Sequence, residues 1–160
     1  MTKAIFLDRD GVLNRELGHY VTSVDDFEML PTVPAALLLA AKSSYLLIII
    51  SNQGGVAKGL YTMEQVLEMH AKLEFEANKM GVHIAEGYYC PHHPDVEPCL
   101  CRKPQSLMVQ QAIDRFDIDP KLSFMIGDKQ RDMEAAEGAG VKGVLMPTNS
   151  DLLDVVKRIL

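Results

Sequence analysis

The stretch Ile5-Phe6-Leu7-Asp8-Arg9-Asp10-Gly11-Val12 decides the fold class, because a short apolar run ends abruptly in two carboxylates and a glycine. Similar apolar runs recur along the chain, and amphipathic stretches with helical spacing separate them. Such alternation indicates parallel strands that are connected by crossover helices. The five expected strands are Ala4–Leu7, Tyr45–Ile50, Glu86–Tyr89, Ser123–Ile126 and Gly143–Met146. We therefore predict an α/β domain of three layers around a mostly parallel five-stranded sheet.

Helices are expected between these strands. The clearest one begins at Thr62, where Thr62 and Gln65 form a capping box, and ends at Gly81. The others are expected at Val33–Lys42, Ser106–Phe116, Arg131–Ala139 and Asp151–Ile159. Their apolar stripes are interpreted as core, because helical spacing alone accounts for them without a cofactor pocket. The whole pattern predicts a Rossmann-like arrangement, and 160 residues leave no room for a large cap domain.

Size and composition indicate one globular domain, residues 1–160, with 48% apolar and 24% charged residues. The longest apolar run, Tyr45–Ile50, is too short to span a bilayer, and the first residues lack a secretory cleavage site. We therefore expect a cytoplasmic protein that does not bind membranes. The net charge of −6 argues against a nucleic-acid surface, which requires clustered basic residues.

Chemically active residues follow the apolar runs at four places. In an open parallel sheet, the carboxyl ends of the strands form the binding crevice. The four segments are Asp8–Asp10, Ser51–Gly55, Arg102–Pro104 and Gly127–Asp132. Each segment alone is better explained as a turn, a helix cap or solvated surface. Together they supply three acids, a hydroxyl and basic groups, which is the set that phosphoryl transfer requires.

These motifs, in this order, resemble those of the haloacid dehalogenase superfamily of phosphohydrolases. The resemblance extends over nearly the whole chain and implies a phosphomonoester hydrolase that forms an aspartyl-phosphate. Asp8 would be the nucleophile, and Asp10 would act as general acid and then as general base. Ser51 and Lys103 would hold the transferring phosphoryl group.

The same resemblance implies a catalytic Mg²⁺ ion. Its expected ligands are Asp8, Asp128 and the backbone carbonyl of Asp10. The residues leave open whether Asp132 contacts this ion or supports one of its ligands.

A second cluster of metal-binding residues lies in the loop at about 90–103. Cys90, Cys99 and Cys101 fall within twelve residues, together with two adjacent histidines. Three sulfurs and one nitrogen complete a tetrahedral structural zinc site. The alternative is a set of free buried thiols, but a loop so poor in apolar residues has little else to fold it. We expect His92 to be the fourth ligand, although the spacing does not distinguish it from His93.

With this zinc loop, the chain resembles the branch that contains D-glycero-D-manno-heptose 1,7-bisphosphate 7-phosphatases and histidinol-phosphate phosphatases. The phrases around Cys90, Arg102 and Lys129 are closer to the heptose enzymes, which implies lipopolysaccharide biosynthesis. The expected substrate-binding residues are Asn52, Arg102, Lys129 and His19. Histidinol phosphate is the alternative substrate, and the anomeric preference stays open.

Two other classes remain as alternatives. A DNA 3′-phosphatase is disfavoured by the acidic net charge. A non-catalytic zinc-stabilised binding protein would be expected to lack Asp8 or Asp10. We therefore expect a monomeric phosphatase that acts on a small phosphorylated sugar or amino alcohol.

Overall fold

The computed structural model describes all 160 residues and contains one five-stranded sheet in which all paired strands are parallel. The strand order is β3-β2-β1-β4-β5. The order reverses between β1 and β4, which is the place where open α/β sheets bind their ligands. The strands are β1 (Lys3–Leu7), β2 (Tyr45–Asn52), β3 (Glu86–Cys90), β4 (Phe124–Gly127) and β5 (Lys142–Leu145).

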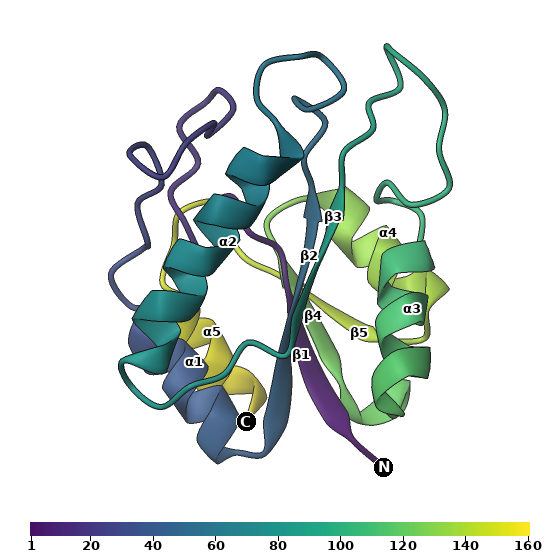
Figure 1. Ribbon diagram of the computed structural model, residues 1–160. Helices are drawn as coiled ribbons and strands as arrows, with labels where there is room; N and C mark the ends of the chain where they lie inside the picture. The colour runs from purple at the N-terminus through teal and green to yellow at the C-terminus, as the bar shows by residue number, and fades with distance from the viewer.

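Helices cover both faces of this sheet. Helices α1, α2 and α5 lie on one face, and α3 and α4 lie on the other (Figure 1). Their bounds are α1 (Val33–Lys42), α2 (Met63–Asn78), α3 (Leu107–Phe116), α4 (Gln130–Gly138) and α5 (Leu152–Ile159), with a short 3-10 helix at Pro120–Leu122. The predicted three-layer α/β fold with a parallel five-stranded sheet is therefore confirmed. No helix of this fold combines the length and the apolar character needed to cross a bilayer.

Several boundaries differ from those predicted. Strand β2 continues two residues past Ile50, because Ser51 and Asn52 stay paired with β3. Helix α2 has the expected capping box at Thr62 but ends at Asn78, and Gly81 follows with φ of 74°. Both differences arise because hydrogen bonding to neighbouring backbone, rather than side-chain pattern, decides where an element ends.

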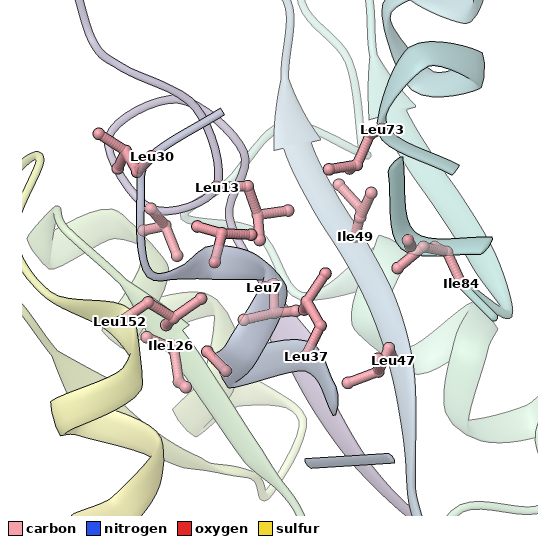
Figure 2. Close-up of a cluster of buried hydrophobic side chains, with 14 of the residues drawn as sticks. Leu7, Leu13, Leu30, Leu37, Leu47, Ile49, Leu73, Ile84, Ile126 and Leu152 are labelled. Carbon is pink, nitrogen blue, oxygen red and sulfur yellow. The ribbon is translucent and has the colours of Figure 1, made fainter. Parts of the chain in front are cut away.

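The core has two parts, one on each face of the sheet. Leu47 and Ile49 of β2 belong to the larger cluster under α1 and α2, whereas Ile48 and Ile50 belong to the cluster under α3. Figure 2 shows the larger cluster, in which Ile49 lies among leucines of several elements. This alternation confirms that β2 is buried on both faces, as its solid apolar run predicts.

The register brings the strand ends to one edge of the sheet. Leu7 of β1 pairs with Ile49 of β2 and with Ile126 of β4. The backbone N–H of Asp8 then donates to the Ile126 carbonyl, at 3.0 Å. The residues that follow β1, β2 and β4 therefore meet at the same edge, where long loops also emerge (Figure 1).

Candidate active site

The centre of the site is a buried ion pair between Asp8 and Lys103. The Lys103 ammonium donates to Asp8 Oδ1 at 2.9 Å and to the Ile50 carbonyl at 2.7 Å, and it lies 2.7 Å from Asp132 Oδ1. Burial alone lowers the pKa of Lys103, but the charges of Asp8 and Asp132 outweigh it and leave this pKa raised. The lysine therefore stays charged, with three oxygens within 2.9 Å of its ammonium nitrogen.

Asp8 has one anchored and one free carboxylate oxygen. Oδ1 accepts hydrogen bonds from Lys103 and from the backbone N–H of Arg9, at 2.9 Å each. The structure shows no hydrogen bond to Oδ2. Burial raises the pKa of Asp8 to about 7, against the opposing charge of Lys103. This carboxylate is held in one orientation and leaves one oxygen available for chemistry.

Asp10 lies beside Asp8 and is held by three side chains. Its Oδ1 accepts hydrogen bonds from Arg9 and Asn14, both at 2.8 Å, and its Oδ2 accepts one from Gln53 at 3.0 Å. Burial acts to raise the pKa of Asp10, but the Arg9 charge and these donors outweigh it and hold the pKa below its usual value. Asp10 is therefore ionised in the resting protein.

The Asp128 side chain packs directly against Gly11 and so reaches this site. A Cβ at Gly11 would lie 2.3 Å from Asp128 Oδ2, and Gly11 has φ of 87°. Asp128 Oδ2 accepts a hydrogen bond from the Thr148 hydroxyl at 2.8 Å, while its Oδ1 is buried without a hydrogen-bond partner. Oxygens of Asp8, Asp128 and Asp132 lie within 4.8 Å of one another. An orphaned buried oxygen among three carboxylates fits a hard cation such as Mg²⁺.

Asp132, whose role the sequence leaves open, is fully buried. It forms the ion pair with Lys103, and its Oδ2 accepts a hydrogen bond from the Lys129 backbone N–H at 3.1 Å. A Cβ at Gly127 would lie 2.4 Å from the Asp132 carboxylate, so the glycine allows this approach. The geometry makes Asp132 a partner of Lys103 as well as a member of the acidic cluster.

A pocket of ≈ 450 Å³ opens above these acids. Its lining combines the carboxylates of Asp8, Asp10 and Asp128 with residues of the loop after β1, the end of β2 and the start of α4. The remaining lining residues are Glu16, Gly18, His19, Tyr20, Val21, Asn52, Lys129 and Arg131. Three of the four residues predicted to bind substrate, His19, Asn52 and Lys129, are therefore brought together here.

Arg102, the fourth predicted substrate residue, does not line this pocket. Its guanidinium donates to the His92 carbonyl at 3.2 Å, and the residue borders a smaller neighbouring cavity of ≈ 270 Å³. Asn52 lines the larger pocket and bonds to a residue of the smaller cavity. Its side chain donates to the Lys103 carbonyl at 3.1 Å and accepts from the Lys103 backbone N–H at 3.0 Å.

The predicted metal loop forms a compact cluster of three thiols and one imidazole. Cys90 Sγ lies 2.9 Å from Cys101 Sγ and 3.8 Å from Cys99 Sγ, and His92 Nδ1 lies 3.3 Å from Cys101 Sγ. His92 Nε2 lies 3.8 Å from a Glu97 oxygen, the kind of outer partner that orients a metal-ligating histidine.

The neighbouring histidine lies outside this cluster. His93 Nδ1 instead accepts a hydrogen bond from the Asp95 backbone N–H, at 3.1 Å. The structure thus places His92, and not His93, beside the three thiols.

Known proteins with similar sequences extend over nearly the same length. The chain is 40% identical over 164 residues to D-glycero-beta-D-manno-heptose-1,7-bisphosphate 7-phosphatase of Pasteurella multocida, with 99% of this chain and 89% of the relative covered. It is 42% identical to the enzyme of the same name from Haemophilus influenzae, over 89% of this chain and 79% of the relative. The HAD-hydrolase-like family model matches residues 100–157. The chain belongs to the HAD-like hydrolase family.

Solved structures of HAD-like hydrolases share this fold. The crystal structure of D,D-heptose 1,7-bisphosphate phosphatase from B. bronchiseptica, complexed with magnesium and phosphate, has a TM-score of 0.90 and 30% identity. The match covers 99% of this chain and 98% of that one. This similarity, together with the relatives, identifies the chain as a HAD-like phosphatase without a large cap domain.

Three residues of this HAD-like site were not singled out by sequence reasoning. Arg9 is fully buried beside Asp10, Gln53 bonds to Asp10, and Arg131 lines the pocket. Gln53 and Arg131 lie within the segments Ser51–Gly55 and Gly127–Asp132 that the sequence analysis named, so their position near the site could have been predicted. The contact of Gln53 with Asp10 joins residues 43 positions apart in the chain, and only the fold reveals it.

Proposed function

We propose that this phosphatase removes the 7-phosphate of D-glycero-D-manno-heptose 1,7-bisphosphate, with Asp8 as the nucleophile. The observation that carries the proposal is the Asp8–Lys103 pair, buried at the base of a pocket whose wall bears Lys129 and Arg131. Acids at the base and cations at the wall suit a substrate with two phosphates, one reacting and one held. The identity of the sugar in this proposal is taken from the names of the similar proteins.

In the first half of the reaction, Asp8 Oδ2 attacks phosphorus while Oδ1 stays fixed by Lys103 and the Arg9 N–H. A carboxylate nucleophile divides a difficult hydrolysis into two easier steps through an aspartyl-phosphate. Lys103 and the Ser51 hydroxyl hold the oxygens of the transferring group. Lys103 donates hydrogen bonds to Asp8 and to the Ile50 carbonyl, and its contact with Asp132 Oδ1 is an ion pair without a hydrogen bond. We assign its third N–H to an oxygen of the phosphoryl group.

Asp10 moves the protons in both halves. It must be protonated to neutralise the departing sugar oxygen and ionised to activate water. The resting protein holds Asp10 ionised, which is the form needed for the second half. The negative charge of the incoming phosphates raises the pKa of Asp10, and this favours uptake of the proton needed for the first half.

A catalytic Mg²⁺ ion is part of this proposal. Asp8, Asp128 and the backbone carbonyl of Asp10 would hold it, with Asp132 buried alongside. When bound, the ion neutralises the clustered carboxylates and the charge on the transferring phosphoryl group. The orphaned Asp128 Oδ1 supports this assignment.

The second phosphate of the substrate is assigned to Lys129 and Arg131. Lys129 is half exposed and lies 4.0 Å from Asp128, while the structure shows no ion pair for Arg131. Both cations therefore remain available to an anion in the pocket. Histidinol phosphate carries an ammonium group at the corresponding end, and these cations would repel it.

A structural zinc ion completes the proposal. Cys90, His92, Cys99 and Cys101 would hold it, and the closed set of four leaves no position for a substrate. The loop carries Arg102 and Lys103 directly after Cys101, so a fixed loop keeps Lys103 against Asp8. We also propose that the protein acts as a monomer in the cytoplasm, without nucleic-acid or membrane partners.

The test is phosphate release in Mg²⁺ from the heptose bisphosphate and from histidinol phosphate, with Asp8→Asn as the blank. We expect release of one phosphate per heptose, from the 7-position, at a kcat/KM at least about ten-fold above that for histidinol phosphate. The reverse preference would replace the proposed substrate. If Asp8→Asn released phosphate at the wild-type rate, Asp8 would not be the nucleophile.

A further inference from the structure

The side-chain amide of Gln53 is fully engaged at the base of the site. Its Nε2 donates one hydrogen bond to Asp10 Oδ2 at 3.0 Å and another to Ser51 Oγ at 2.8 Å. Its Oε1 accepts a hydrogen bond from the Tyr61 hydroxyl at 2.6 Å. Gln53 is 2% exposed and Tyr61 4% exposed, so water does not replace these partners. One amide thus joins the proposed acid–base residue to the proposed phosphoryl-holding hydroxyl.

The Tyr61 hydroxyl decides which way this amide faces. A glutamine amide has one accepting oxygen and one donating nitrogen of nearly equal shape. If the amide rotated by half a turn, its oxygen would face the Asp10 carboxylate, and both would be acceptors. By donating to Oε1, the tyrosine stabilises the orientation in which both N–H groups point at Asp10 and Ser51. Buried networks of this kind fix one arrangement when every member is satisfied.

Tyr61 is itself held firmly on the other side. A Cβ at Gly55 would lie 2.3 Å from Tyr61 Cε1, so the ring packs directly against backbone. The ring also lies 5.9 Å, centroid to centroid, from Tyr20, which lines the pocket. The next residue, Thr62, caps helix α2 through a capping box. The hydroxyl is therefore placed by a helix start and by a pocket-lining aromatic side chain.

We propose that Tyr61 is a positioning residue for protonation of the leaving group, acting through Gln53 on Asp10. The inference rests on the proposed role of Asp10 as the acid that protonates the leaving oxygen. Tyr61 touches neither substrate nor reacting atoms. Its hydroxyl keeps the Gln53 amide oriented, and the amide keeps Asp10 Oδ2 at its place in the site.

The experiment compares wild type with Tyr61→Phe on two substrates of different leaving group. The heptose bisphosphate releases a sugar alkoxide, which needs a proton from Asp10. p-Nitrophenyl phosphate releases a stable anion, which does not. The value of kcat/KM reports the steps up to the first irreversible one, and here that step is departure of the leaving group. Phenylalanine keeps the ring, so packing against Gly55 and Tyr20 is retained.

We expect Tyr61→Phe to lower kcat/KM for the sugar bisphosphate by about ten-fold, and for p-nitrophenyl phosphate by less than about two-fold. The matched control is Tyr89→Phe. Tyr89 also forms a 2.6 Å hydrogen bond through its hydroxyl, to His70 Nδ1, but it does not line the pocket. This control should leave both values near those of wild type.

Equal losses on the two substrates, or equal losses in Tyr61→Phe and Tyr89→Phe, would assign Tyr61 a structural role only and overturn the inference. A second variant, Gln53→Met, keeps a side chain of similar length but removes the N–H donor to Asp10, and it should show the same selective loss on the sugar substrate. A wild-type protein that hydrolyses p-nitrophenyl phosphate but not the sugar bisphosphate would overturn the proposed function, and the inference with it.

Discussion

Lys103 and Asp8 lie 95 residues apart in the chain, yet their charged atoms are 2.9 Å apart and almost fully buried. Asp132 faces the same ammonium from the other side, at 2.7 Å. One cation therefore holds together the end of β1, the loop before α3 and the start of α4. The Lys103 side chain, which orients the Asp8 carboxylate, therefore also links three parts of the fold.

Removing this cation should destabilise the protein strongly. Lys103→Met leaves two buried carboxylates without their partner, and breaking a buried pair in this way costs about 3–5 kcal/mol. Urea unfolding measures the loss, and the comparison is Lys121→Met, an exposed lysine whose replacement should change stability by less than about 0.5 kcal/mol. Similar stabilities for the two variants would mean that Lys103 does not hold these elements together.

The raised pKa of Asp8 predicts that stability depends on pH in a particular direction. Its folded-state pKa of about 7 lies above the ordinary value of 3.8, so ionisation of Asp8 disfavours the folded state. The penalty is absent below pH 4, grows as the pH rises toward 7, and is constant above that. In magnesium-free buffer, Asp8→Asn should therefore melt at about the wild-type temperature at pH 4 and above it at pH 8. A variant that melts lower than wild type at pH 8 would contradict this sign.

The acidic residues of the site could be predicted because each directly follows an apolar strand. Asp8, Asp10 and Asp128 needed only the rule that the carboxyl ends of parallel strands meet at one edge. The sheet and the crossover helices followed from the same periodicity, and the absence of a large cap followed from the length of 160 residues. Local patterns were sufficient wherever the decisive contact lay within one element or between adjacent strand ends.

The hydrogen-bond network around Asp10 could not be predicted in this way. Arg9 is fully buried although it is charged, because its guanidinium bonds to Asp10 and lies 5.4 Å from the centre of the Phe27 ring. The partners of Gln53 are 43 residues before it and eight residues after it. Such contacts depend on loop paths that no periodicity encodes. The choice between His92 and His93 depends in the same way on the backbone of a loop without regular structure.

That choice gives a prediction about the cysteine loop. His92→Ala should reduce the zinc content of the purified protein well below about one equivalent and lower its melting temperature, because a structural zinc site contributes directly to folding. His93→Ala is the control and should keep its zinc, since His93 faces Asp95 instead of the thiols. Metal analysis and thermal melting measure both. Loss of zinc in His93→Ala, with zinc retained in His92→Ala, would reverse the ligand assignment.

Arg131 provides the last prediction, on the recognition of the second phosphate. It lines the pocket from helix α4 and has no ion-pair partner, so its charge should act on the phosphate that is not cleaved. Arg131→Gln should raise KM for the heptose bisphosphate about ten-fold, the value of one charge-assisted hydrogen bond, and change kcat little. The same variant should leave kinetics with the heptose 7-monophosphate unchanged, because that substrate has no second phosphate. Arg115→Gln removes an equal charge from α3, outside the pocket, and should affect neither substrate. If Arg131→Gln weakened both substrates equally, Arg131 would act on the reacting phosphate or on the pocket as a whole, and the second phosphate would have to be bound by other residues.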